Sequence, residues 1–210
     1  MNIVLVHGWG HDASVWNAVR ARLDPALSVT TLDFGYFGAV PPAPTFAGPV
    51  IAVGHSLGAL WWLTQHDIPW RRLLMVNGFP RFTTTDGYPG VAPRVLDRMR
   101  KQFANAPAEV LADFHARCGA PGPSPGTDVA RLAQGLAQLA ELDGRAALAA
   151  RGDDVWALAG TDDPIVLHAM SAAAFAALPA GHCEWIDAPG HLLPLTHPGL
   201  CAQWIERLAA

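Results

Sequence analysis

The sequence predicts an α/β protein with a reduced, mostly parallel, doubly wound sheet and a helical insertion. Short runs of β-branched and aliphatic residues alternate along the chain with segments of helical spacing, which is typical of parallel sheets covered by helices. These runs are apolar at every position, as expected for strands buried on both faces. With 210 residues, 51% hydrophobic and 15% charged, the chain has the size and composition of one folded domain.

The expected strands and helices divide the chain into a core and an insertion. Six strands are expected, over residues 3–6, 29–32, 50–53, 73–76, 155–158 and 184–186. Core helices are expected over 14–23, 57–64, 167–178 and 198–208. Between 86 and 148 no convincing strand occurs, but helical spacing recurs over 93–103, 107–117 and 128–139. We therefore expect residues 1–85 and 149–210 to form the core and residues 86–148 to form a helical lid inserted in it.

Charge, hydropathy and cysteine usage argue against several classes of protein. A net charge of −4 disfavours a nucleic-acid partner. No apolar stretch approaches the roughly 18 residues of a membrane span, and the first residues do not resemble a signal peptide, so we expect a cytoplasmic protein without a membrane partner. Cys118, Cys183 and Cys201 are far apart and odd in number, so neither a disulfide framework nor a metal site is predicted.

One segment has the pattern of a nucleophilic serine. Gly54-His55-Ser56-Leu57-Gly58 fits G-x-S-x-G and lies between the predicted strand 50–53 and the predicted helix 57–64. A serine on a strained turn from strand to helix needs glycines two residues to either side, because a side chain there would clash with neighbouring backbone. The position of the motif therefore indicates that Ser56 is a nucleophile.

A serine hydroxyl needs a histidine base and a carboxylate that orients the histidine. Asp162 and Asp163 follow the predicted strand 155–158, at the carboxyl end where open parallel sheets bind ligands. Asp163 is the preferred acid, with Asp162 as the alternative. His191 follows the last predicted strand on a Pro-Gly loop and is the expected base.

Acyl transfer also needs hydrogen-bond donors for the oxyanion that forms on the substrate. We expect one donor to be the backbone N–H of Leu57, directly after the nucleophile, and the other to be the N–H of Trp9, in the loop after the first strand. The indole of Trp9 would then border the acyl pocket, although ordinary packing at the edge of the core also explains a tryptophan there.

The insertion carries an apolar set and a basic set of side chains. Val95, Met99, Phe103, Leu111 and Phe114 recur at helical spacing and would line an aliphatic acyl pocket, with plain packing as the alternative. Arg94, Arg98, Arg100 and Lys101 crowd the first helix, where a solvated face is the alternative. No metal or organic cofactor is implied.

The motifs resemble those of the α/β-hydrolase superfamily over nearly the whole chain. Within it, the chain is similar to the pimeloyl-[acyl-carrier protein] methyl ester esterases of biotin synthesis. That similarity lies in His7-Gly8-Trp9-Gly10, Ser14-Val15-Trp16, Tyr88-Pro89-Gly90-Val91, Gly135-Leu136, Leu142-Asp143, Gly190-His191 and Thr196-His197-Pro198. The resemblance implies an α/β-hydrolase fold and an esterase that acts on an acyl ester carried by acyl-carrier protein.

The resemblance also implies a basic surface on the lid that docks the acidic carrier protein. Arg94, Arg98, Lys101 and Arg117 are the candidates for that surface. The chain departs from the family at Glu109 and Asp113, which stand where basic residues are expected. We also expect the sheet to be smaller than the family's, without its first antiparallel strands, and we expect residues 35–49 to be too short and too rich in proline and glycine for the usual crossover helix.

Two other functions are compatible with the motifs. The same serine, histidine and aspartate could hydrolyse a small general ester or an acyl thioester. The fold could also serve as a binding protein without catalysis, although such proteins commonly lose a member of the triad.

Overall fold

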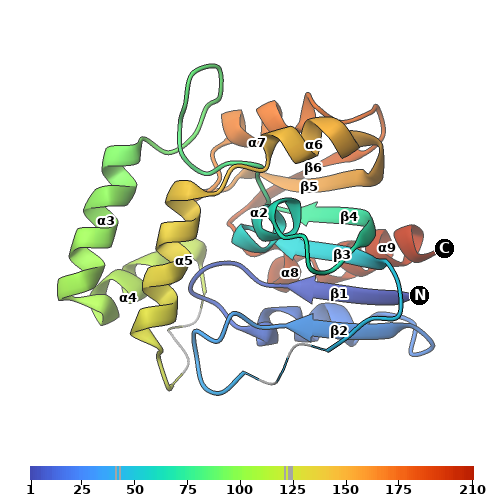
Figure 1. The fold of residues 1–210 in the computed structure, drawn as a ribbon, viewed down its shortest axis with the longest axis horizontal. Coiled ribbons are helices and arrows are strands. Elements are labelled where there is room, and N and C mark those ends of the chain that lie inside the picture. Colours follow the sequence, from blue (N-terminus) through green and yellow to red (C-terminus); the bar gives the residue numbers. More distant parts are fainter. Residues whose placement is uncertain (41, 43, 121, 123–124) are drawn as a thin grey trace.

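The computed structural model describes residues 1–40, 42, 44–120, 122 and 125–210. Its centre is a six-stranded sheet with the order β2-β1-β3-β4-β5-β6, and every neighbouring pair of strands is parallel (Figure 1). The strands are β1 (Asn2–Val6), β2 (Ser28–Leu32), β3 (Val50–His55), β4 (Trp70–Val76), β5 (Val155–Asp162) and β6 (Cys183–Pro189). All six predicted strands are confirmed, and each is longer than its predicted range.

The central strands β1 and β3 are apolar over most of their length because each contributes to two cores. Along β1 and β3, alternate residues such as Leu5 and Val53 belong to one apolar cluster, and their neighbours Val4 and Ala52 belong to another. Successive side chains of a strand point to opposite faces of the sheet. The two clusters therefore fill the spaces above and below the sheet, as the continuous apolar runs predict.

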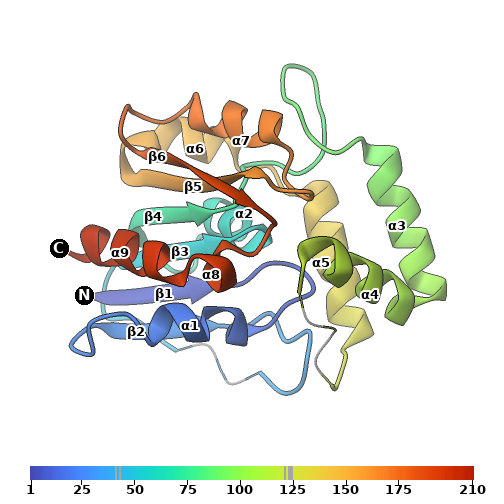
Figure 2. The ribbon, with the colours of Figure 1, turned by 180° about the vertical axis from the view of Figure 1, so that it is seen from behind.

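Helices cover both faces of the sheet (Figures 1 and 2). One face carries the 3₁₀ helix η1 (Ala13–Trp16), α1 (Asn17–Arg20), α8 (Leu193–Thr196) and α9 (Pro198–Ala209). The other carries α2 (Leu57–Thr64) and α6 (Arg145–Arg151), and α7 (His168–Phe175) packs on β5. The predicted helix 14–23 is therefore two short helices, and the predicted helix 167–178 is shorter at both ends.

In the described part of the chain, four α-helices, the 3₁₀ helix η2 (Gly152–Asp154) and a loop separate β4 from β5. The helical patterns at 93–103, 107–117 and 128–139 are confirmed as α3 (Pro93–Asn105), α4 (Pro107–Cys118) and α5 (Val129–Glu141). Proline begins α3 and α4, where its missing N–H costs nothing, and Gly119 at φ 71° ends α4. Figure 1 shows α3, α4 and α5 beside the carboxyl ends of the strands, whereas α6 returns to the sheet.

The connection from β2 to β3 contains no helix in its described part, 33–40, 42 and 44–49. This agrees with the proline- and glycine-rich sequence of that segment. Across the described chain, no helix combines the length and the apolar character that crossing a membrane requires.

Candidate active site

Ser56 lies on a strained turn between β3 and α2. Its backbone has φ 54° and ψ −121°, a conformation that non-glycine residues rarely adopt. The flanking glycines make the turn possible: a Cβ on Gly54 would lie 2.4 Å from the backbone nitrogen of Ala59, and a Cβ on Gly58 would lie 2.4 Å from the carbonyl oxygen of Val6. The geometry of the G-x-S-x-G segment is thus the one that the motif requires.

His191 and Asp163 form a buried hydrogen-bonded pair. His191 Nδ1 lies 2.7 Å from Asp163 Oδ2, and both side chains are almost wholly excluded from solvent. The other oxygen of Asp163 accepts the N–H groups of Ile165 and Val166, at 2.8 and 2.9 Å. These bonds fix the plane of the carboxylate, and the pair in turn makes Nδ1 the protonated nitrogen of the imidazole.

The second ring nitrogen of His191, Nε2, makes no hydrogen bond to any described residue. Nε2 is buried and has no hydrogen-bond partner there, Ser56 included. Hydrogen bonds between nucleophile and base are often longer in ligand-free structures than in substrate complexes. Nε2 is therefore the atom of the pair that remains able to accept a proton.

The competing acid, Asp162, does not contact His191. It is exposed at the end of β5, and its backbone carbonyl accepts the N–H of Gly190 at 3.3 Å. Asp163 is thus the aspartate that the structure brings to the histidine.

Two donors hold the backbone of the histidine loop, and the sequence analysis assigned neither. Asn77 Nδ2 and His55 Nε2 both donate to the carbonyl oxygen of His191, at 2.8 and 2.9 Å. Asn77 follows β4 at φ 44°, and its Oδ1 accepts the N–H of Gly160 at 2.9 Å. Burial lowers the pKa of His55 well below its usual value, and the nearby charge of His191 acts in the same direction, so the ring is a neutral donor.

Leu57 directly follows Ser56, and Trp9, which carries the other expected oxyanion donor, lines the same cavity as Ser56. Leu57 is the first residue of α2, so its N–H has no partner within the helix, and the N–H of Trp9 likewise has no acceptor in the described chain. Trp9 lies in the loop after β1, and two side-chain hydrogen bonds attach this loop to helices α4 and α5. The indole Nε1 of Trp9 donates to the carbonyl of Leu132 in α5 at 2.8 Å, and His115 Nε2 in α4 donates to the carbonyl of Gly10.

A mainly apolar cavity of about 90 Å³ opens onto Ser56. Four residues of the expected pocket line it, namely Trp9, Val95, Met99 and Phe114. Phe103 and Leu111 do not line it: Phe103 packs edge-on against Trp9, and Leu111 is buried behind the lining. Residues that complete the lining are Phe82, Val91, Leu96, Arg117, Leu139 and Ile165.

The chain matches the model of the alpha/beta hydrolase family over residues 3–204. It belongs to that family. A pimeloyl-[acyl-carrier protein] methyl ester esterase from Aromatoleum aromaticum is 28% identical, with 98% of this chain and 96% of that protein covered. The enzyme of the same name from Pectobacterium carotovorum is 35% identical over 49% of this chain and 47% of its own length. The first curated relatives are matched over only 38% and 47% of their own lengths.

Solved structures show the same alpha/beta hydrolase architecture. An esterase from Exiguobacterium antarcticum superposes with a TM-score of 0.82 at 16% identity, covering 100% of this chain and 92% of that one. At this identity the likeness establishes the fold alone.

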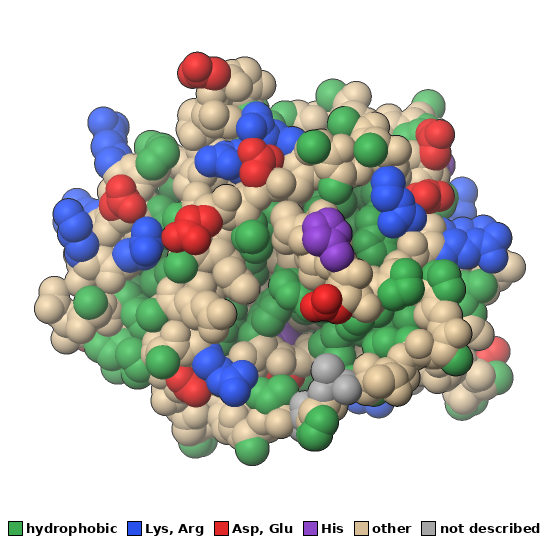
Figure 3. Space-filling view, viewed as in Figure 1, with side chains coloured by type: hydrophobic (Ala, Val, Ile, Leu, Met, Phe, Trp, Pro, Cys, Tyr) green, Lys and Arg blue, Asp and Glu red, His purple; other side chains and the backbone are tan. Residues whose placement is uncertain are grey.

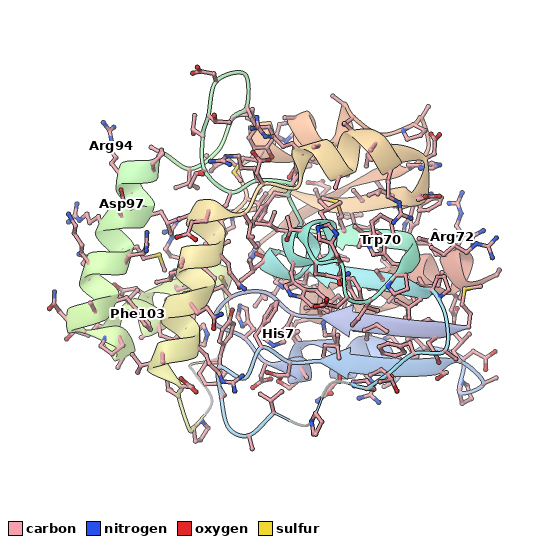
Figure 4. All side chains as sticks on the ribbon, viewed as in Figure 1. His7, Trp70, Arg72, Arg94, Asp97 and Phe103 are labelled. Atoms are coloured by element: carbon pink, nitrogen blue, oxygen red, sulfur yellow. The ribbon has the colours of Figure 1, made fainter. Side chains whose placement is uncertain are left out.

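The four candidate carrier-docking residues of this alpha/beta hydrolase fall into two places. Arg94, Arg98 and Lys101 surround a shallow depression on α3 together with Asp97, and Arg94 points away from the rest of the protein (Figure 4). Basic side chains gather over α3 with acidic ones between them (Figure 3), and Asp97 lies 3.8 Å from Arg100. Arg117 instead lies on α4 at the cavity of Ser56.

A group of buried histidines lies around the loop after β1 and the candidate triad, but it is not arranged as a metal site. His11 stacks on His115 with ring centroids 5.1 Å apart, and His55 lies 4.7 Å from His191. In the described residues, no set of three or more His, Cys, Asp or Glu side chains is placed to hold a metal ion.

Proposed function

We propose that this chain is a serine carboxylesterase that works through an acyl-enzyme, with Ser56 as nucleophile, His191 as base and Asp163 as the acid. The observation that carries the proposal is the buried pair of His191 and Asp163, with Nε2 unpaired and the His191 ring 4.7 Å from that of His55, the residue before Ser56 at φ 54°. A strained backbone at a serine, kept in place by close glycine contacts, is a feature of functional sites rather than of ordinary turns.

The reaction proceeds in two steps. Ser56 Oγ attacks the ester carbonyl while His191 Nε2 takes its proton, and the N–H groups of Trp9 and Leu57 bind the oxyanion. His191 then protonates the departing alcohol, leaving an acyl group on Ser56. In the second step His191 activates a water molecule that releases the acid, and throughout Asp163 holds the imidazole in its tautomer.

We further propose that the natural substrate is a pimeloyl-[acyl-carrier protein] methyl ester, used in biotin biosynthesis. The support is the activity for which the relatives are named, above all the relative from Aromatoleum aromaticum, which this chain matches over nearly its whole length. Arg94, Arg98 and Lys101 on α3, with Arg117 at the cavity, are the candidates for docking the acidic carrier protein. The apolar lining between them and Ser56 suits a chain of methylene groups.

A decisive experiment measures hydrolysis of pimeloyl-[acyl-carrier protein] methyl ester by the wild type and by Ser56→Ala, with p-nitrophenyl butyrate assayed beside it. Demethylation that depends on Ser56 is the expected result. Arg98→Ala should raise the KM for the carrier-linked ester and leave hydrolysis of the butyrate unchanged. Activity of Ser56→Ala equal to that of the wild type would refute the assigned nucleophile.

One observation favours a second candidate, a general esterase or thioesterase for short acyl chains. The cavity at Ser56, about 90 Å³, is small beside the several hundred Å³ typical of ligand pockets. Turnover of the butyrate ester without turnover of the carrier-linked ester would select this candidate. Absence of any turnover would instead support a binding protein that does not catalyse.

A further inference from the structure

Arg117 is the charged residue in the lining of the cavity at Ser56. It lies in the last turn of α4, and apart from Ser56 the other described lining residues are apolar. The cavity therefore combines a nucleophile, Ser56, with a positive charge, Arg117, and the lining between them is apolar. Such an arrangement selects ligands that carry a negative group at a distance from the reacting bond.

The guanidinium of Arg117 is held in place without being neutralised. Its Nη2 donates to the carbonyl oxygen of Pro164 at 3.1 Å, next to the triad aspartate in sequence. In the described residues no carboxylate lies within ion-pair distance, and Asp113, one turn earlier on the same helix, does not pair with it. The exposed guanidinium therefore keeps donors for a ligand, and its fork of N–H groups matches a carboxylate.

We propose that Arg117 binds the free carboxylate of a dicarboxylic acid monoester, so that the enzyme hydrolyses such monoesters without a carrier protein. The ester end lies at Ser56, the methylene chain lies along the apolar lining, and the carboxylate pairs with Arg117. Water and the monoester give the free dicarboxylic acid and the alcohol: the acyl C–O bond breaks, Ser56 holds the acyl group in between, and His191 passes one proton to the alcohol. The proposal rests on the proposed role of Ser56.

Three methyl esters test the proposal: monomethyl pimelate, dimethyl pimelate and methyl heptanoate. They share the reacting bond and the chain, and only the first carries a carboxylate. For the wild type we expect kcat/KM to be roughly tenfold higher for the monoester than for the neutral esters. Arg117→Leu should bring the kcat/KM for the monoester down to the level of the neutral esters through a higher KM for the monoester, and Arg117→Lys should retain part of the preference.

Arg20→Leu is the matched control, because Arg20 is an exposed arginine on α1, away from the cavity. It should retain the wild-type preference. Equal preferences in the wild type and in Arg117→Leu would overturn the proposal. An equal loss of kcat/KM on all three esters in Arg117→Leu would overturn it too, because it would show that Arg117 acts by holding the loop at Pro164. If the wild type hydrolysed none of the esters in a Ser56-dependent way, the proposed function would fail along with it.

Discussion

Asp163 differs from the other candidate acid, Asp162, in its contact with the histidine. It alone of the two aspartates binds His191, at 2.7 Å, and its second oxygen is used by two backbone N–H groups. Asp163→Asn keeps the shape but presents an amide to the imidazole, which then adopts the wrong tautomer. We expect kcat to fall by about 10⁴-fold, the loss that this change causes in other triads.

Asp162→Asn is the matched control for that substitution, because it changes the adjacent residue in the same way. Its side chain is exposed and does not contact His191, so kcat on p-nitrophenyl butyrate should remain close to that of the wild type. A large loss in Asp162→Asn with an active Asp163→Asn would reverse the assignment.

Asn77 is a positioning residue that sequence motifs do not reveal. Its side chain bridges the His191 carbonyl and the Gly160 N–H, and thereby joins the end of β4 to β5 and to the histidine loop. Asn77→Ala removes both bonds from buried partners, which should cost about 1–3 kcal/mol in the free energy of unfolding and lower kcat.

Asn77→Gly separates the lost hydrogen bonds from the backbone strain at φ 44°. Glycine adopts this conformation freely, whereas alanine is penalised there by about 1 kcal/mol. Asn77→Gly should therefore be more stable than Asn77→Ala in urea unfolding, with the same loss of kcat. If both variants kept the wild-type kcat, the bridge would be structural only.

At the scale of helices, α4 and α5 hold the oxyanion loop. His115 of α4 binds the Gly10 carbonyl, and the Trp9 indole binds α5, so both helices fix the backbone that presents the Trp9 N–H. His115→Phe keeps an aromatic ring beside His11 but removes the donor. We expect kcat to fall about tenfold or more, because a displaced oxyanion donor weakens binding of the transition state.

His115→Gln is the comparison variant, since its amide restores an N–H at a similar distance from the backbone. It should recover part of the kcat that His115→Phe loses, while KM for p-nitrophenyl butyrate changes little in either. Equal kcat values for the phenylalanine and glutamine variants would show that the hydrogen bond to Gly10 does not position the loop.

The sequence predicted those elements and motifs whose conformation is determined by residues within a few positions of each other. Strand β3 and the elbow after it follow from an apolar run and two glycines, and His191 from its Pro-Gly loop. By contrast, Asn77, His55 and His115 act through bonds to residues between 105 and 136 positions away. No local pattern encodes such pairs, and for the same reason helical spacing alone could not separate Met99, in the cavity, from Phe103, behind it.

At the scale of the whole molecule, the buried histidines link acid stability to the junction between the sheet and the inserted helices. Burial lowers the pKa of His11 well below 6.5, because a charged imidazole there would be desolvated and would be repelled by the neighbouring histidines when they are protonated, and burial lowers the pKa of His55 as well. Both rings are neutral in the folded protein and bind protons on unfolding. Their contribution to stability is therefore full above about pH 6.5 and is lost as the pH falls below it.

We expect the free energy of unfolding to fall below pH 6.5 by about 1.4 kcal/mol per pH unit for each of the two histidines. His11→Phe should reduce the slope, because it removes one of these groups and His11 Nε2 makes no hydrogen bond to a described residue. Urea unfolding at pH 7.5, 6.5 and 5.5 measures it. An unchanged slope in His11→Phe would contradict the assignment.

Since His11 stacks on His115 of α4, protonation of His11 should loosen the contact that positions Trp9, so activity should decline in acid before the sheet itself unfolds.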